Sequence, residues 1–219
     1  MDQYLTDTDV RVLGALIEKQ ITTPDNYPLS LNALVAACNQ SSNRNPVVSF
    51  DDEIVLAAIT RLRRASLLRG IQRIDSRVTK YEHTADDTLN LDERETAVMC
   101  VLMLRGPNTV GELRTRTERL AKFDNPAEIE STLTALIERE VEPLVVRLPR
   151  RAGQKELRYA HLLSGEVAVD SAELSTTTVA VDGAPNDDRV AVLERAVAEL
   201  KNEVGDIRRQ LEEFRKQFE

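Results

Sequence analysis

Apolar side chains recur every three or four residues in three segments near the start of the chain, which is the spacing of one buried helix face. The segments lie at residues 6–20, 30–38 and 51–65. Two runs with the character of strands follow at residues 67–71 and 77–82, on either side of a turn. Three helices followed by a β-hairpin are the order of elements in a winged helix, whose second and third helices form a helix-turn-helix. The expected core positions of the helices are Val10, Leu13, Leu16, Ile17, Leu31, Leu34, Val35, Cys38, Val55, Ile59 and Leu62.

Polar residues mark the ends of these helices. Thr6 or Thr8 can cap the first helix and Ser30 the second, because a hydroxyl oxygen accepts hydrogen bonds from unpaired backbone N–H groups. The polar run at residues 39–45 ends the second helix, and Pro46 leads into the third. The third helix starts with three acidic residues, which the helix dipole favours there.

The same order of elements returns in the second half of the chain. A helix opens after residues 91–92, Thr109 caps a shorter helix that runs through Arg119, and a third helix begins near Pro126. A second hairpin is expected within residues 144–161. Such a repeat indicates a duplicated structural unit. The third helices show it best, since Val55, Ile59 and Leu62 recur at a constant offset of 74 as Ile129, Leu133 and Leu136.

The end of the chain has a different pattern. Residues 164–188 carry six acidic and no basic side chains and are rich in Ser, Thr and Ala, so we expect a flexible acidic linker. Apolar residues then alternate steps of three and four, which predicts a coiled coil that joins two chains in parallel. A helix that folds back on its own domains is the alternative. The heptad positions are Val190, Leu193, Val197, Leu200, Val204, Ile207, Leu211, Phe214 and Phe218.

A net charge of −8 would disfavour nucleic-acid binding if it were spread evenly over the chain, but most of it lies in one segment. Residues 1–85 are neutral, residues 86–163 carry −2, and the linker carries −6. No segment reads as a signal peptide, and no apolar run approaches the roughly 18 residues that span a membrane. Both cysteines lie in apolar helical runs, where a thiol acts as a small hydrophobe. These features predict a cytoplasmic protein without a disulfide framework.

Basic residues concentrate between residues 61 and 80, where seven positive charges accompany the single acid Asp75. Arg61 and Arg64 are expected on the face of the third helix opposite its core residues. A winged helix can present this helix to the major groove and its hairpin to phosphates. The alternative is a solvated face whose arginines pair with neighbouring acids. The expected DNA contacts in the first domain are Arg61, Arg64, Arg69, Arg73, Arg77 and Lys80.

The second domain offers weaker signals for DNA. The matching outer positions of its third helix are Ser131, Thr134 and Glu138, which carry no positive charge. Its basic residues lie on the second helix and on the hairpin, where they can contact phosphates or remain solvated. The hairpin candidates are Arg150, Arg151 and Lys155.

Sequence patterns of catalysis and cofactor binding are absent. Cys38, His83, Cys100 and His161 could provide four zinc ligands by number, but no pair has the close spacing of a zinc motif. No glycine-rich phosphate loop or nucleophile motif occurs. We therefore expect a protein that is not an enzyme and has no cofactor.

Four stretches of the chain resemble the YceH-like family of uncharacterised bacterial tandem winged-helix proteins. They are CNQSSNRNPV, RVTKYEH, GELRTRTERL and RYAHLLSGE. The resemblance covers roughly residues 5–166 and implies the architecture, but it provides no catalytic residues. Ala152 departs from it, standing where we associate the family with proline.

The sequence thus predicts a mainly α-helical α+β protein with β-hairpin wings. Its expected parts are winged-helix domains at 1–86 and 87–163, a linker at 164–188 and a dimerising helix at 189–219. The expected function is DNA binding, in transcription regulation or chromosome organisation. The alternative is a protein-interaction module whose winged helices hold a partner's helix, as in chromosome-partitioning complexes.

Overall fold

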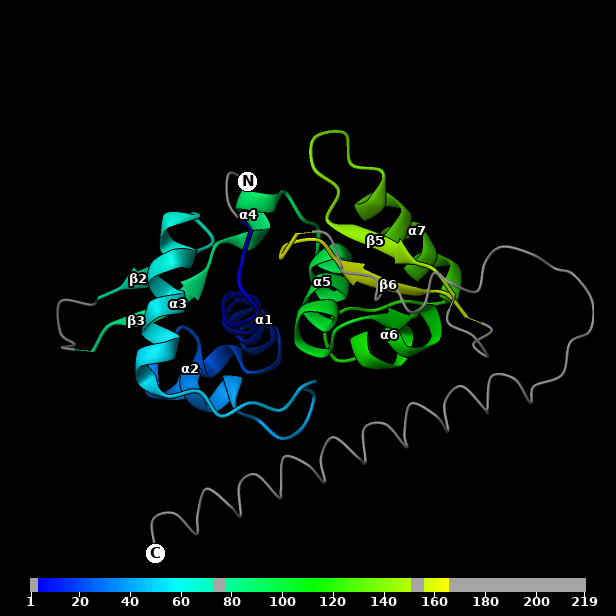
Figure 1. Ribbon diagram of the computed structural model, residues 1–219. Coiled ribbons are helices and arrows are strands. Elements are labelled where there is room, and N and C mark those ends of the chain that lie inside the picture. Colours follow the sequence, from blue (N-terminus) through cyan, green and yellow to red (C-terminus); the bar gives the residue numbers. More distant parts are fainter. Residues whose placement is uncertain (1–3, 73–77, 151–155, 166–219) are drawn as a thin grey trace, which may run out of the picture. The chain divides into compact units, whose positions relative to one another are not determined.

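The computed structural model describes residues 4–72, 78–150 and 156–165. Within these residues the chain is a mixed α+β protein with seven α-helices and two three-stranded antiparallel sheets (Figure 1). Several predicted features lie outside the described residues: the tips of both hairpins with Arg73, Arg77, Arg151 and Lys155, nearly all of the acidic linker, and every heptad position.

The first set of elements, called the N-terminal lobe below, starts with three helices. Thr6 caps α1 by accepting a hydrogen bond from the Asp9 amide, as its position predicts, while Ser30 caps α2 and Asp51 caps α3. The three strands form a sheet in the order β1-β3-β2. The elements are α1 (Asp7–Thr22), a 3-10 turn (Pro24–Asn26), β1 (Leu29–Ser30), α2 (Leu31–Cys38), α3 (Asp52–Arg64), β2 (Leu68–Ile71) and β3 (Lys80–His83).

The second set, the C-terminal lobe, repeats this arrangement. Asp92, Thr109 and Asn125 cap its three helices. Its sheet has the equivalent order β4-β6-β5. The short helix α4 (Ala85–Leu89) precedes the lobe, whose elements are α5 (Glu93–Arg105), β4 (Asn108–Thr109), α6 (Val110–Thr117), α7 (Pro126–Ile137), β5 (Val145–Leu148) and β6 (Arg158–His161).

The duplication predicted from the sequence is confirmed by topology and burial. In both sheets the closing histidine pairs with the first residue of the preceding strand: His83 lies opposite Leu68, and His161 opposite Val145. The repeated core positions of the third helices, namely Val55, Ile59, Leu62, Ile129, Leu133 and Leu136, are all buried. Three helices with a small sheet in each lobe are consistent with winged helices.

The structure differs from the sequence prediction in its short elements. Strands β1 and β4 were not expected, because two residues are too few to show a period, and each exists through its pairing with the last strand of its sheet. Helix α4 was also missed. Helix α6 ends at Thr117 and does not continue to Arg119, and the Thr117 carbonyl then accepts from the amides of Leu120 and Ala121 in the turn that follows.

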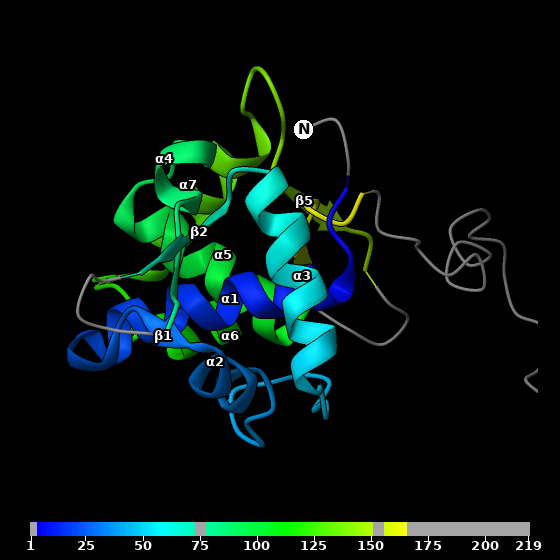
Figure 2. The ribbon, with the colours of Figure 1, turned by 90° about the vertical axis from the view of Figure 1, so that its left-hand side faces the viewer.

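Helix α1 joins the two lobes. It packs against α2 and α3 of its own lobe and against α5 of the other (Figure 1 and Figure 2). Ten consecutive residues of α1, from Asp9 to Glu18, are buried, as are nine of α5, from Thr96 to Leu104. A helix buried on all sides lies inside a core and not on a surface. None of the helices in the described parts of the chain could span a bilayer.

Candidate nucleic-acid interface

The outer surface of α3 changes character along the helix. Its first residues are acidic. Asp51 caps the helix by accepting a hydrogen bond of 2.9 Å from the Ile54 amide, and Asp52 and Glu53 follow it. Its middle is aliphatic, where Ile54 is 39% and Leu56 41% exposed. Its last turn is basic and contains Arg63 and Arg64. The helix therefore offers positive charge only at its C-terminal end.

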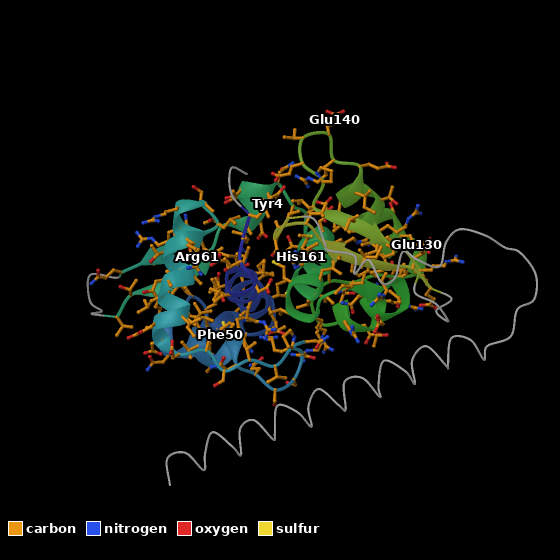
Figure 3. The ribbon with its side chains drawn as sticks, viewed as in Figure 1. Tyr4, Phe50, Arg61, Glu130, Glu140 and His161 are labelled. Atoms are coloured by element: carbon orange, nitrogen blue, oxygen red, sulfur yellow. The ribbon has the colours of Figure 1, made fainter. Side chains whose placement is uncertain are left out.

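Arg61, expected on the outer face of α3, is 39% exposed at its side chain and also has an internal partner. Its guanidinium lies on the side of α3 toward α1 and bonds to the Asp9 carboxylate at 2.9 Å (Figure 3). Asp9 is 1% exposed and also accepts from the Thr6 hydroxyl at 2.8 Å. A buried carboxylate requires a paired cation. Arg61 is thus a partly exposed counterion of a buried carboxylate, which agrees with the alternative that the arginines pair with neighbouring acids.

Arg63 and Arg64 remain as the cations of α3. Both are exposed, and neither side chain makes a hydrogen bond or an ion pair with another described residue. Arg64 was expected to face solvent, whereas Arg63 was missed. Arg63 directly follows the buried Leu62, and the side chains of adjacent helical residues point about 100° apart. Its side chain could therefore have been expected to point away from the core. Cations in the last turn of a helix also interact favourably with the helix dipole, so Arg63 and Arg64 stabilise α3 as well.

The hairpin after α3 adds two more cations. Arg69 in β2 is 69% exposed at its side chain and bonds to Glu82 on the neighbouring strand. Lys80 in β3 is exposed. We call Arg63, Arg64, Arg69 and Lys80 the basic edge of the N-terminal lobe. Because one of its arginines already has an acidic partner, the positive surface is interrupted within the described residues.

The corresponding surface of the C-terminal lobe is not basic. The exposed residues of α7 include Glu130, Ser131 and Thr134, and none of its residues is Lys or Arg. Arg147 and Arg150 on and after β5 are exposed. This lobe therefore presents its positive charge away from its third helix.

The cysteines and histidines occupy four separate structural positions. Burial raises the pKa of Cys38 to about 12 and that of Cys100 further, so both thiols are protonated at neutral pH. His83 contacts the Gln20 side chain and donates its backbone amide to the Tyr27 hydroxyl at 2.7 Å. Burial lowers the pKa of His161 to about 4. Among the described residues, no three His, Cys, Asp or Glu side chains cluster as metal ligands.

The polar run at residues 39–45, after α2, has a role that its sequence did not predict. Arg44 is buried and bonds to the Glu18 carboxylate at 2.7 Å and to the Ala37 carbonyl at 2.8 Å. The Asn45 amide donates to the Leu104 carbonyl in α5 at 2.9 Å. We expected this run to end a helix and form a turn. It also ties the N-terminal lobe to the end of α5.

Comparison with known proteins shows the chain's relatives. A family described as "Protein of unknown function, DUF480" matches residues 5–154. A UPF0502 protein of Solibacter usitatus is 53% identical over 201 residues, which cover 92% of this chain and 95% of that protein. UPF0502 proteins of Aliivibrio salmonicida and Pelobacter propionicus are 48% and 49% identical, over 92% and 100% of this chain and 94% and 100% of theirs.

Proposed function

Since the chain belongs to the DUF480 (UPF0502) family of bacterial proteins, we propose that it is a non-enzymatic DNA-binding protein with two tandem winged helices. Self-association through the C-terminal heptads is part of this proposal. The proposed role of this DNA binding is in transcription regulation or chromosome organisation.

One observation carries the proposal: Arg63 and Arg64 are exposed at the end of α3 without an acidic partner among the described residues, beside a basic hairpin. The start of the same helix carries Asp51, Asp52 and Glu53, which repel the phosphates on both sides of a groove. The expected contacts are therefore mostly with phosphates and have little sequence preference. Arg73, Arg77 and the hairpin of the second lobe would extend this surface.

A different observation supports the protein-interaction alternative. Ile54 and Leu56 are exposed aliphatic residues in the middle of α3, and α7 has no basic residue at all. An amphipathic helix of a partner protein could pack on such a surface. If the apolar middle of α3 packs against a partner protein, the same surface is not free to enter a DNA groove. Experiments can therefore distinguish the two functions.

Fluorescence anisotropy with a labelled random duplex tests the proposal, from low to physiological salt. Binding should weaken with salt, with a log–log slope of about −0.9 for each phosphate contact. Arg63→Gln with Arg64→Gln should weaken binding to all sequences and flatten the slope. Arg114→Gln is the matched control, because Arg114 is equally exposed on α6 of the other lobe.

Two results would replace DNA binding with the protein-interaction alternative. One is no binding by the unchanged protein at low salt. The other is that neither variant changes DNA binding. This requires the Arg63/Arg64 variant and a second variant, with Arg69, Arg73 and Arg77 all changed to Gln, to bind as tightly as the unchanged protein.

A further inference from the structure

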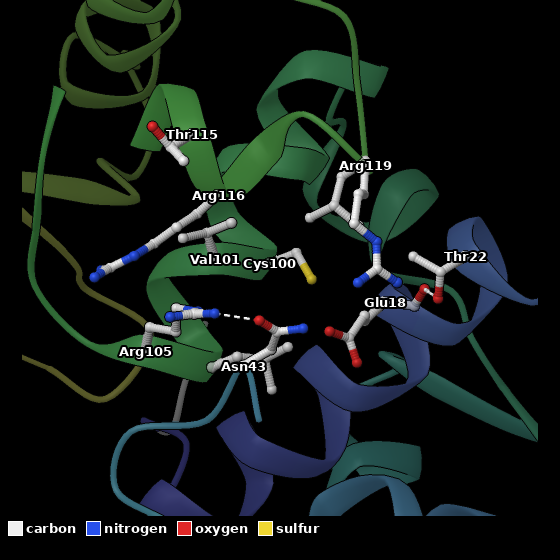
Figure 4. Close-up of a pocket in the computed structure, with 11 residues that line it drawn as sticks. Glu18, Thr22, Asn43, Cys100, Val101, Arg105, Thr115, Arg116 and Arg119 are labelled. Carbon is white, nitrogen blue, oxygen red and sulfur yellow. Dashed lines mark hydrogen bonds between the residues drawn. The ribbon is translucent and has the colours of Figure 1, made fainter. Parts of the chain in front are cut away.

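A cavity of about 360 Å³ lies between the two lobes (Figure 4). Glu18 and Thr22 of α1 and Asn43 of the following loop form the wall from the N-terminal lobe. The opposite wall belongs to α5, α6 and the turn after α6, and includes Arg105 and Arg119. This volume is at the small end of the roughly 300–1,000 Å³ of ligand pockets, so it suits a small molecule and not a macromolecule.

The charges around the cavity do not balance. Glu18 is neutralised by Arg44, whose guanidinium holds both carboxylate oxygens, at 3.2 and 2.7 Å. Arg116 has its own partner, Glu112, at 3.0 Å. Arg105 donates only to the neutral side chain of Asn43, and Arg119 has no hydrogen-bond or ion-pair partner among the described residues. Arg105 and Arg119 therefore line the cavity without an ion-pair partner among the described residues.

Arg105 is partly buried and lies near a second guanidinium. Burial, followed by repulsion from Arg116, lowers the pKa of its guanidinium below the ordinary value. An anion in the cavity would relieve that repulsion. Figure 4 shows Arg105 and Arg119 on opposite sides of Cys100, and both side chains are long enough to turn toward a common ligand.

We propose that this cavity binds a small phosphate monoester, the size of a sugar phosphate or a nucleoside monophosphate. A phosphate monoester carries a charge of about −1.5 to −2 at neutral pH, which matches the two unpaired guanidiniums better than a single carboxylate does. Its uncharged body lies against the apolar part of the wall, made by Val101, Leu104 and Leu120. The Glu18 carboxylate accepts a hydrogen bond from a ligand hydroxyl or amino group and disfavours a second phosphate.

Calorimetry and thermal unfolding of the full chain test this site. The probes are AMP and glucose 6-phosphate, with adenosine and glucose as their uncharged counterparts and inorganic phosphate as the isolated anion. The phosphorylated probes should bind and raise the melting temperature, because a ligand that contacts both lobes binds only the folded chain. Their uncharged counterparts should not.

Variants locate the binding site. Arg105→Gln with Arg119→Gln should weaken the phosphorylated probes by roughly tenfold or more, since two charge-assisted contacts are lost. Arg119→Gln alone should reproduce part of the loss, and it disturbs no described contact. Arg114→Gln, at an exposed position of α6 that does not line the cavity, should bind as the unchanged protein does.

Three outcomes would overturn the proposal: no binding of either phosphorylated probe, undiminished binding by the Arg105/Arg119 variant, or displacement of a bound probe by duplex DNA. The last would assign these arginines to nucleic-acid phosphates. Because the Arg63/Arg64 variant leaves the cavity intact, failure of the DNA-binding proposal does not affect this test.

Discussion

Gly14 of α1 lies directly against Leu104 of α5. A Cβ atom at Gly14 would be 3.0 Å from the Cγ and Cδ2 atoms of Leu104 and 3.2 Å from the Cβ atom of Met103. Cys100 approaches the same residue, with its Sγ atom 3.6 Å from the Gly14 carbonyl oxygen. The absence of a side chain at Gly14 thus permits α1 and α5 to pack closely at this point.

Gly14→Val should lower the free energy of unfolding by about 1–3 kcal/mol or more, because extra carbons in a packed core force neighbouring groups apart. Gly111→Ala is the control, since a Cβ at this exposed helical position meets no atom closer than 4.0 Å. That change should be neutral or stabilise by up to about 1 kcal/mol. Urea unfolding measures both. A Gly14→Val protein as stable as the unchanged one would contradict the packing described here.

Arg44→Met should destabilise the protein by about 3–5 kcal/mol, because it leaves the buried Glu18 carboxylate without its cation. Lys19→Met is a matched control, as Lys19 lies 3.9 Å from the same carboxylate but makes a weaker contact. Chemical denaturation should show a much smaller loss for the control. Adding Glu18→Gln to Arg44→Met should recover part of the stability, and no recovery would show that the pair is not coupled.

Arg61→Met and Arg64→Met should differ although both remove a cation from α3. The first uncovers the buried Asp9 carboxylate and should reduce the free energy of unfolding by about 1–3 kcal/mol. The second should change it by no more than about 0.5 kcal/mol, as surface changes do. Equal effects in thermal or urea unfolding would mean that the Asp9–Arg61 pair does not stabilise the fold.

Stability should fall as the pH drops through the range in which His161 titrates. Its folded pKa of about 4 is below the ordinary value of about 6.5, so the unfolded chain binds a proton that the folded chain does not. The free energy of unfolding therefore decreases between these pH values, by at most about 3 kcal/mol from this group. His161→Gln should have a flatter profile in urea unfolding at several pH values. Identical slopes would exclude His161 as the cause.

The heptad pattern predicts self-association of the full chain. Leu193→Asp with Leu200→Asp would place charges in the apolar seam and should give the monomer mass in light scattering at micromolar concentrations. Glu194→Gln, outside the seam, should leave the larger mass unchanged. A monomer mass for the unchanged protein across the concentration range would reject the coiled coil.

The local elements and their duplication could be predicted from sequence because they depend on neighbouring residues. The caps Thr6, Ser30 and Thr109 and the two core faces with an offset of 74 were all recognisable. Helical spacing shows which residues leave water, and a capping side chain acts only a few residues away. Strands β1 and β4 lacked such a signal, since a two-residue strand depends on a distant partner.

Sequence alone thus determined two similar helical units, each followed by a hairpin, together with the basic stretch from residue 61 to residue 80. The tertiary structure decided what the polar residues contact. Arg61 and Arg44 have equivalent charges, yet one pairs with Asp9, 52 residues away, and the other with Glu18, 26 residues away. Long polar side chains carry no periodic signal, so only the packing of α1 among α2, α3 and α5 determines which charges are buried and which remain for a ligand.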